Sequence, residues 1–412
     1  MAKVIPFKGI RPTVEKCSKI AALPYDVYNR EEAKEVVSKN PDSFLAIDRA
    51  ETSFPDDVDT YDERVYQKAH DMLWERINKG DFVEEEKKVY YIYELIMDGR
   101  SQTGIVACAS IDDYINNIIK KHENTRADKE VDRIKHVSAC EAQTGPIFLA
   151  YRSNDVINAI VSKVKGTPAL YDFVAEDGIT HKAWIISDEA DIDAIEKAFE
   201  GMDSIYIADG HHRCASACKV GMKKREENPN YTGDEEFNYF LSVLFPDDQL
   251  MIMDYNRVVK DLNGLSEADF ADKIYKVFDK VSESDEPIKP SAKGQVSMLL
   301  GGKWTLLNVK DEFKSEDPIK GLDVSILQNE ILDPILGIKD PKTDKRIDFV
   351  GGIRGLKELE RRCNKDCVLA FAMYPTSIGE LFNVADAHLL MPPKSTWFEP
   401  KLRSGMFIHC IK

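Results

Sequence analysis

A short apolar strand that ends abruptly in a polar motif most constrains the fold of this chain. Residues 203–208, Asp-Ser-Ile-Tyr-Ile-Ala, predict a buried strand that stops at Asp209-Gly210. A helical pattern takes over at about Arg213 and runs to Glu227. The chain is therefore expected to join a strand directly to a helix, which is typical of folds that mix the two kinds of element.

Strands and helices are predicted along much of the remaining chain. Residues 88–97 are aromatic and β-branched and predict a strand, Asp98-Gly99 predicts a hairpin turn, and residues 104–111 the returning strand. The acidic stretch 49–59 is interpreted as an irregular surface loop. Because alternation is loose and strands pair through short turns, we expect an α+β or mixed α/β fold and not a doubly wound sheet.

The length of 412 residues predicts two domains, since a single hydrophobic core rarely grows so large. Residues 228–234, Asn-Pro-Asn-Tyr-Thr-Gly-Asp, form the clearest linker. We expect a catalytic domain over residues 1–230 and a second α+β domain over residues 231–412, whose tail could cover the active site.

The composition limits the classes of partner. A formal net charge of −16 disfavours nucleic acid, because its binders need a basic stripe to displace counterions. The chain start lacks the apolar core of a signal peptide, and no apolar stretch approaches the roughly 20 residues of a membrane span. The eight dispersed cysteines are expected to be buried thiols in a reducing compartment. We expect a cytoplasmic protein without membrane or nucleic acid partners; whether it forms a homo-oligomer stays open.

The motif Asp209-Gly210-His211-His212-Arg213 carries the most chemistry. The first N–H groups of a helix lack internal partners and attract anions. Gly210 allows close approach of the main chain, and Arg213 can grip a phosphate or carboxylate with two nitrogens. The two histidines can donate hydrogen bonds or move protons. A competing interpretation, Asp209 as the helix N-cap, accounts for Asp209 alone.

A second polar segment is His122-Glu123-Asn124-Thr125-Arg126, followed by Asp132-Arg133 and His136. Here Glu123 can serve as a general base, and Arg126 and Arg133 as anion-binding groups. Residues 120–132 are equally typical of a charged, solvated stretch with ion pairs four residues apart. Both interpretations stay open.

Two further segments also allow two interpretations each. Pro24-Tyr25-Asp26-Val27 places Asp26 in a cleft as a ligand or in an ordinary turn. Residues 391–401, Met-Pro-Pro-Lys-Ser-Thr-Trp-Phe-Glu-Pro-Lys, either cover an active site or dock on the core. The phosphate-binding loop ending in GK[ST], the dinucleotide fingerprint and the protein-kinase signatures are missing.

Four motifs together resemble a widespread prokaryotic family, catalogued as domain of unknown function 1015. They are PYDV (24–27), KHENT (121–125) with DR downstream (132–133), DGHHR (209–213) and MPPKSTWFEPK (391–401). They occur in the family's order and cover essentially the whole chain. The DGHHR segment is in turn similar to the ParB and sulfiredoxin superfamily, where a polar motif at a helix start holds nucleotide phosphates. Some relatives phosphorylate free L-serine.

The resemblance implies a ParB/sulfiredoxin-like nucleotide-binding first domain that transfers a phosphoryl group from ATP or ADP to L-serine, giving O-phosphoserine. It implies Glu123 as the base on the acceptor hydroxyl, although Asp26 or another acid could take that role. Asp209 would hold Mg²⁺ or orient the acceptor, and His212 would act beside it. The groups implied at the nucleotide are Gly210, His211, His212, Arg213, Thr125 and Arg133. This mechanism requires the Glu123 segment to lie close to DGHHR.

Two other functions are weighed against the kinase. A nucleotide-binding or nucleotide-hydrolysing regulator of the ParB type would alter a partner instead of an acceptor. A sulfiredoxin-type reductase would need a reactive cysteine in the phosphate motif, where this chain has Asp-Gly-His-His and then Cys214 among apolar helix neighbours. An acceptor-dependent product distinguishes the kinase from the regulator.

Overall fold

Two compact units make up the structure, a computed structural model that describes residues 1–125 and 127–412. Contacts along the chain group residues 1–250 and 400–412 into unit 1, and residues 251–399 into unit 2. Both units combine sheets with helices, which confirms the expected α+β class. No helix in the described ranges is both long enough and apolar enough to cross a bilayer.

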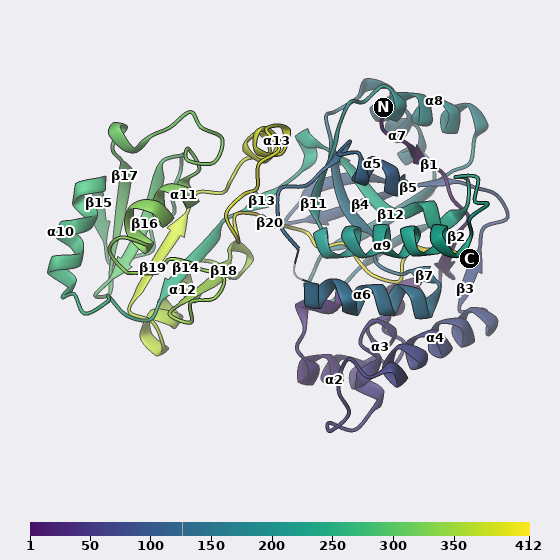
Figure 1. The fold of residues 1–412 in the computed structure, drawn as a ribbon, viewed down its shortest axis with the longest axis horizontal. Helices are drawn as coiled ribbons and strands as arrows, with labels where there is room; N and C mark the ends of the chain where they lie inside the picture. The colour runs from purple at the N-terminus through teal and green to yellow at the C-terminus, as the bar shows by residue number, and fades with distance from the viewer. Residues whose placement is uncertain (126) are drawn as a thin grey trace. The chain divides into compact units, whose positions relative to one another are not determined.

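A nine-stranded sheet forms the centre of unit 1 (Figure 1). The order is β6-β11-β8-β12-β5-β4-β10-β9, and β1 also pairs with β5. The pairs β6–β11 and β8–β12 are parallel, whereas the other neighbours in this sheet are antiparallel. The strands are β1 (Val4–Ile5), β4 (Tyr90–Met97), β5 (Arg100–Ser110), β6 (Ile119–Lys120), β8 (Ile147–Tyr151), β9 (Tyr171–Val174), β10 (Thr180–Ile186), β11 (Ile205–Asp209) and β12 (Tyr239–Pro246).

The predicted hairpin between β4 and β5 is confirmed. Asp98 and Gly99 have φ values of +52° and +78°, the left-handed conformation that a tight two-residue turn requires. The strands on either side pair from Met97 with Arg100 to Tyr91 with Val106. Their aromatic and β-branched side chains are almost all buried, so this hairpin anchors the middle of the sheet.

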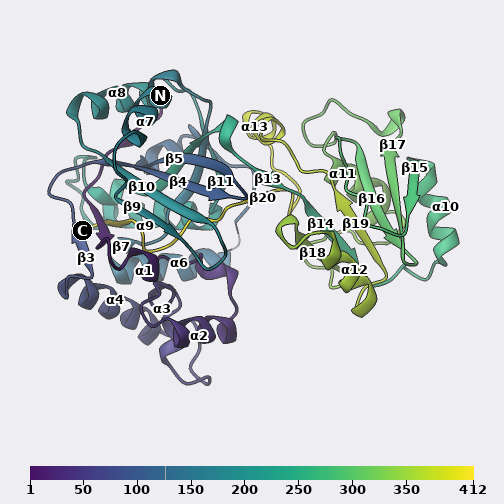
Figure 2. The ribbon, with the colours of Figure 1, turned by 180° about the vertical axis from the view of Figure 1, so that it is seen from behind.

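Helices cover the sheet of unit 1. α6 and α9 lie side by side (Figure 1), and strands of the sheet lie in front of α9 when unit 1 is seen from behind (Figure 2). α4 packs against α6, and α7 packs against α8. The helices are α1 (Cys17–Ile20), α2 (Arg30–Lys39), α3 (Leu45–Asp48), α4 (Glu63–Asn78), α5 (Ile111–Ile115), α6 (Ala127–Cys140), α7 (Asp155–Lys165), α8 (Glu189–Glu200) and α9 (His211–Glu227).

The end of the chain returns to unit 1. β21 (Ile408–Cys410) pairs with β2 (Gly9–Pro12) and with β7 (Ala142–Gln143), and β3 (Phe82–Glu84) completes a second, four-stranded sheet. Just before β21, Phe407 is fully buried, with its ring 4.9 Å from that of Tyr91 and 5.7 Å from that of Tyr93. The last residues are therefore part of the core of unit 1.

Unit 2 is built on a six-stranded antiparallel sheet in the order β15-β17-β16-β19-β14-β18, beside a two-stranded ribbon of β13 and β20. The strands are β13 (Ile252–Met253), β14 (Tyr255–Val259), β15 (Phe278–Ser284), β16 (Gln295–Leu300), β17 (Lys303–Val309), β18 (Ile347–Gly351), β19 (Leu369–Met373) and β20 (Trp397–Phe398). The helices are α10 (Glu267–Val277), α11 (Asp323–Leu327), α12 (Leu356–Lys365) and α13 (Ile378–Asp386).

Most of the proline-rich segment 391–401 is held within unit 2. Arg257 Nη2 donates to the Lys394 carbonyl at 3.1 Å, and Thr376 Oγ1 donates to the Ser395 carbonyl at 3.0 Å. Of the two interpretations, docking onto a core therefore holds for this part of the segment, whereas Lys401 belongs to unit 1. A cover over the active site stays a prediction.

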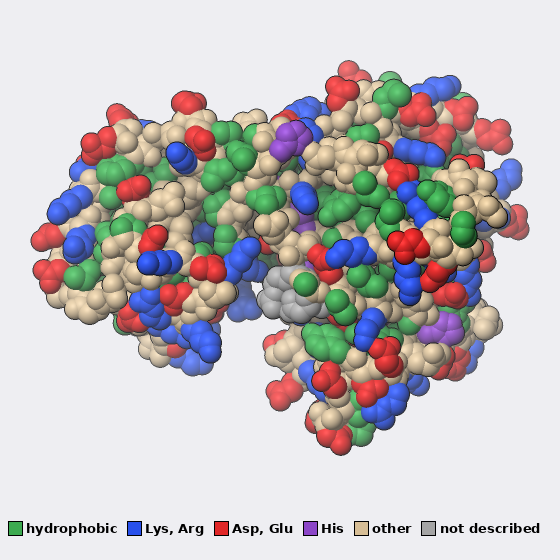
Figure 3. Space-filling model, viewed as in Figure 1, with side chains coloured by type: hydrophobic (Ala, Val, Ile, Leu, Met, Phe, Trp, Pro, Cys, Tyr) green, Lys and Arg blue, Asp and Glu red, His purple; other side chains and the backbone are tan. Residues whose placement is uncertain are grey.

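Two expectations from the sequence differ from the structure. β12 was assigned to the second domain, but it pairs with β5 and β8 of unit 1, so the contacts divide the chain after Leu250. A functional boundary near residue 230 stays a prediction. In the stretch 49–59, residues 53–59 are mostly exposed and irregular as expected, but the stretch begins with a buried turn in which Glu51 is 2% exposed. On the face drawn in Figure 3, acidic and basic side chains are interspersed.

Phe407→Ala is expected to lower the free energy of unfolding of unit 1 by about 3–5 kcal/mol, because it empties a fully buried aromatic site. Urea denaturation followed by circular dichroism measures the loss. Val174→Ala removes a 65% exposed side chain from β9 and serves as the control, with an expected change of less than about 0.5 kcal/mol. Equal losses in the two variants would show that the C-terminal segment is not part of the core.

Candidate active site

The polar motif begins at the last residue of β11. Asp209 ends the strand, Gly210 adopts a left-handed conformation with φ of +90°, and α9 begins at His211. A Cβ on residue 210 would lie 3.1 Å from the Arg213 guanidinium and would strain the backbone, so glycine is required. The helix starts two residues before the predicted position at Arg213, and both histidines lie in its first turn.

The alternative interpretation of Asp209 as the helix cap is wrong. Gly210 occupies the N-cap position, and no side chain caps α9. Asp209 Oδ2 instead lies 3.3 Å from Lys401 Nζ and 3.9 Å from Arg213 Nη2. Burial alone would raise the pKa of Asp209, but Lys401 and Arg213 outweigh it and hold the pKa well below its usual range. Asp209 is therefore ionised at neutral pH, with 39% of its side chain exposed.

The segment that follows β6 lies beside this motif. β6 and β11 are parallel, with Ile119 opposite Ile205 and Lys120 opposite Tyr206. The residues after both strands therefore emerge at the same edge of the sheet, where α/β proteins commonly bind ligands. Glu123, which is partly exposed, comes three residues after β6 ends. The structure thus brings the two predicted segments together, as the kinase mechanism requires.

Two buried histidines form the contact between these segments. The His122 amide nitrogen lies 3.5 Å from His211 Nε2, and the two rings meet edge to face at 4.5 Å. Burial lowers the pKa of His122 to about 4, and burial together with His122 lowers that of His211 well below its usual value. Both rings are neutral at pH 7. Because the His211 ring is neutral and only 6% exposed, its side chain does not offer a positive charge to a ligand.

Thr125 takes part in a network between α6 and α9. Its hydroxyl donates to the Glu130 carboxylate, which also forms an ion pair with Lys219 of α9. Burial would raise the pKa of Glu130, but Lys219 and Thr125 lower it, with a further contribution from His212. Thr125 and His212 therefore both lie near this carboxylate. Arg126, named above as an anion-binding candidate, lies outside the described residues.

A cavity of about 40 Å³ opens beside Arg213. Arg213 Nη1 donates to the Pro146 carbonyl at 2.6 Å, which holds the guanidinium at the cavity wall. Arg133 faces the same cavity, so two of the predicted site residues line it. The lining comprises Pro24, Tyr25, Asp48, Arg133, His136, Val137, Gln143, Thr144, Gly145, Ile147, Arg213, Ala217, Leu241 and Ser404.

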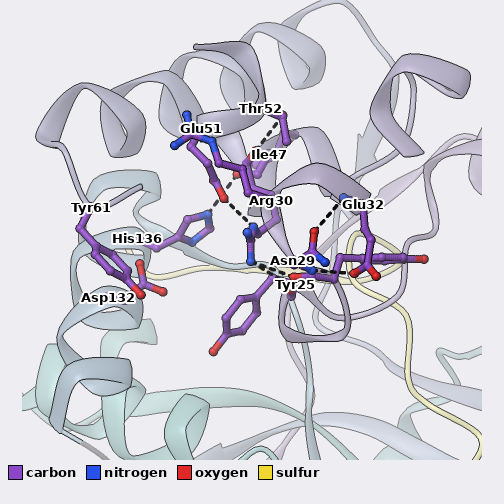
Figure 4. A network of polar contacts seen from close by, with 12 residues as sticks. Tyr25, Asn29, Arg30, Glu32, Ile47, Glu51, Thr52, Tyr61, Asp132 and His136 are labelled. Carbon is purple, nitrogen blue, oxygen red and sulfur yellow. Dashed lines mark hydrogen bonds and ion pairs between the residues drawn. The ribbon is translucent and has the colours of Figure 1, made fainter. Parts of the chain in front are cut away.

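Arg133 is fixed from two sides. Its Nη2 pairs with Asp132 Oδ2 at 2.8 Å, and its guanidinium stacks on the Tyr25 ring at 3.8 Å. Tyr66 donates to the other oxygen of Asp132 at 3.0 Å. Figure 4 shows Tyr25 reaching toward this region from the N-terminal turn, with Asp132 and His136 projecting from α6. Pro24 and Tyr25 of the predicted PYDV turn line the cavity, whereas Asp26 does not.

Sequence reasoning missed the residues that enter the site from distant segments. Asp48 ends α3 and lines the cavity, although it belongs to none of the predicted motifs. Ser404 reaches the cavity from the C-terminal segment, and Lys401 pairs with Asp209. A local signal existed for Asp48, since an apolar run (Phe-Leu-Ala-Ile, 44–47) leads directly into this acid. Lys401 ends the motif 391–401, for which a cover over an active site was one of the two interpretations.

Asp209 could hold a metal ion, but only with help from a ligand. Among the described residues, no group of three or more His, Cys, Asp or Glu side chains is placed to bind a metal. Both cations near Asp209 approach Oδ2, and no described residue donates to Oδ1. A single partly exposed carboxylate suits Mg²⁺, which commonly takes one or two carboxylates and completes its shell with phosphate oxygens and water.

Fold and site together define a mixed α+β protein with a basic strand-to-helix junction. The chain belongs to the family described as protein of unknown function DUF1015, whose model matches residues 4–325. This confirms the resemblance drawn from the motifs. The match includes the first three motifs and ends before the segment 391–401. No match was found among curated proteins.

Several solved structures are similar to this chain. A variant of a free serine kinase in complex with ADP is 13% identical, with a TM-score of 0.34, and the match covers 73% of this chain and 92% of that one. SbnI with a C-terminal truncation, from Staphylococcus aureus, is 10% identical with a TM-score of 0.37, covering 72% and 85%. A free serine kinase in complex with AMP is 15% identical with a TM-score of 0.33, covering 77% and 93%.

Acidification is expected to destabilise unit 1 partly through His122. Its pKa is about 4 in the folded protein against 6.5 ordinarily, so the unfolded chain binds a proton first. The stability contributed by the neutral ring is present above pH 6.5 and is lost as the pH falls toward 4. Between pH 7 and pH 5, the free energy of unfolding measured by urea denaturation should fall by about 2 kcal/mol less in His122→Phe than in the wild type.

The exposed, uncharged Val174 on β9 provides the control for this measurement. Val174→Ala should keep the pH dependence of the wild type. If His122→Phe and wild type lose equal stability on acidification, His122 is not buried in its neutral form.

Proposed function

We propose that the protein is a small-molecule kinase that transfers a phosphoryl group from ATP or ADP to a free hydroxylated amino acid. The proposed acceptor is L-serine and the product O-phosphoserine. The supporting observation is the shared edge of β6 and β11, where Glu123 follows one strand and Asp209 to Arg213 follow the other. Phosphoryl transfer requires that a base and the groups that neutralise the phosphate charge lie close together in a fixed arrangement. Candidates for both lie at this edge of the sheet.

The nucleotide phosphates bind at the start of α9. The N–H groups of His211, His212 and Arg213 begin an uncapped helix and point toward the junction. The Arg213 guanidinium and the Lys401 ammonium add positive charge next to Asp209. Thr125 supports the site from the α6 side. This arrangement uses main-chain donors and two cations in place of a glycine-rich phosphate loop.

The transfer itself needs one base and one stabilised leaving group. The acceptor hydroxyl oxygen bonds to the terminal phosphorus, while the bond from that phosphorus to the bridging oxygen breaks. The hydroxyl proton passes to the Glu123 carboxylate. The bridging oxygen keeps the electron pair and leaves with the nucleotide, its charge balanced by Arg213 and Lys401. His212 donates a hydrogen bond to the transferred group.

Asp209 is the proposed Mg²⁺ ligand through its open Oδ1. When bound, the ion would supply charge neutralisation between phosphate oxygens. The low pKa of Asp209 suits this role, because the carboxylate is ionised without competition from protons at neutral pH. Lys401 and Arg213 occupy the other oxygen and orient the carboxylate.

Purified protein incubated with Mg²⁺, ATP or ADP and a panel of hydroxylated amino acids should yield a phosphorylated amino acid, detected by mass spectrometry. L-Serine is expected to give the highest kcat/KM of the panel. Nucleotide hydrolysis at an equal rate with and without acceptor, and no phosphorylated product, would reject the kinase and favour a nucleotide-hydrolysing regulator.

Removal of the proposed catalytic groups should abolish turnover and leave the fold intact. Asp209→Asn, His212→Ala and Glu123→Gln are each expected to lower kcat/KM by roughly 100-fold or more, the usual effect of losing a general base or an electrostatic group. Matched controls are His70→Ala on α4 and Glu226→Gln at the exposed end of α9.

Circular dichroism and the thermal midpoint of each variant check that its fold is unchanged. The controls should retain the wild-type kcat/KM. Wild-type rates in all three site variants would mean that this junction is structural.

A further inference from the structure

A nearly buried carboxylate lies in the cavity wall without a full set of partners. The side chain of Asp48 is 4% exposed, and its residue lines the cavity. Oδ1 accepts a hydrogen bond from Thr144 Oγ1 at 3.0 Å and lies 4.0 Å from His136 Nε2. No donor among the described residues reaches Oδ2. Because Oδ2 is not one of the fully buried oxygens that lack a partner, a ligand donor can reach it, and a positive charge beside this carboxylate would be stabilised.

His136 does not neutralise Asp48. Burial, and then the positive charge of Arg133, lower the pKa of His136, so that its ring is uncharged at neutral pH. The ring nitrogen Nε2 is closer to the Ile47 carbonyl, at 3.4 Å, than to the Asp48 carboxylate. His136 therefore adds no positive charge beside Asp48, and the nearby cation of the cavity wall is Arg133.

Arg133 offers the complementary group. Its Nε and Nη2 bind Asp132 Oδ2 at 3.0 and 2.8 Å, which balances its charge in part. No acceptor among the described residues reaches Nη1, although the residue lines the cavity. Because Tyr25 and Asp132 already hold the guanidinium in place, a ligand carboxylate could bind it without ordering a free side chain.

We propose that this cavity is the acceptor pocket and that it recognises the acceptor as an α-amino acid zwitterion. Asp48 Oδ2 accepts a hydrogen bond from the α-ammonium group, and Arg133 Nη1 donates to the α-carboxylate. The inference rests on the proposed function and makes its acceptor class specific. It also moves Arg133 from the nucleotide, where the family resemblance put it, to the acceptor.

The cavity lining indicates which part of the acceptor lies near which residue. Arg213 lines the same cavity and pairs with Asp209, so it connects the acceptor pocket to the phosphate site. An amino acid held by both charged groups has only its side chain left to reach toward Arg213.

Ligands that each lack one charge test the inference on the unaltered protein. Isothermal titration calorimetry, with and without ADP, compares L-serine with 3-hydroxypropanoate, which lacks the ammonium, and with ethanolamine, which lacks the carboxylate. Each analogue should bind at least about 100-fold more weakly than L-serine, because a buried group of the site loses its partner. Affinities within about threefold of L-serine for either analogue, or no binding of L-serine, would overturn the inference.

Variants locate the two contacts. In Asp48→Asn the preference for L-serine over 3-hydroxypropanoate should fall to within a few-fold, while the preference over ethanolamine stays. Asp191→Asn on α8 changes a similarly buried aspartate outside the cavity and should bind L-serine like wild type. If Asp48→Asn does not fold, the titrations of wild-type protein with the two analogues still test whether the pocket recognises both charges of the amino acid.

The outcome for the inference is separate from that for the kinase. Phosphorylation of 3-hydroxypropanoate as efficiently as L-serine would support the kinase and reject the zwitterion pocket. Charge-selective, Asp48-dependent binding of L-serine without any phosphorylated product would support the pocket and reject the kinase.

Discussion

Ile119 and Lys120 run in the same direction as Ile205 and Tyr206, and the rest of the site depends on this short parallel pair. Had β6 run antiparallel to β11, the residues after it would emerge at the opposite edge of the sheet, far from Asp209. The register between β11 and β8 also shifts between Ile207 and Asp209, which is where the strand gives way to the motif. Two hydrogen-bonded residue pairs thus bring together segments nearly ninety positions apart, as the separation of His122 and His211 shows.

The charges around this edge come from different parts of the chain and are matched in pairs. Asp209 is balanced by Lys401 and Arg213, while Arg133 is balanced in part by Asp132. The buried histidines stay neutral because each is shielded from water and none has a close carboxylate partner strong enough to retain its proton. The proposed anion binding therefore depends on arginine, lysine and main-chain N–H groups and not on charged histidine.

Local sequence patterns made the strand-to-helix junction predictable. The site residues that come from distant parts of the chain could not be predicted in this way. The apolar strand before Asp209 and the polar run after it reveal a strand-to-helix turn, and Asp98-Gly99 reveals a hairpin, because both depend only on neighbouring residues. The helix start was misplaced because His-His has no strong helical pattern, whereas Gly210 fixes the boundary through its φ. Asp48 and Lys401 could not be placed, since their contacts with Thr144 and Asp209 arise only when remote segments pack.

The return of the C-terminal segment explains how a residue as late as Lys401 can belong to the first unit. Unit 2 is inserted between Leu250 and Pro400, and its two ends are held together where Ile252 pairs with Phe398 and Met253 with Trp397. On the unit 1 side, Arg100 donates to the Gln249 carbonyl at 2.6 Å, which fixes the point of exit. A closed insertion of this kind leaves the host sheet undisturbed. The chain therefore re-enters unit 1 beside its exit, where residues 400–412 supply Lys401 to the junction and β21 to the second sheet.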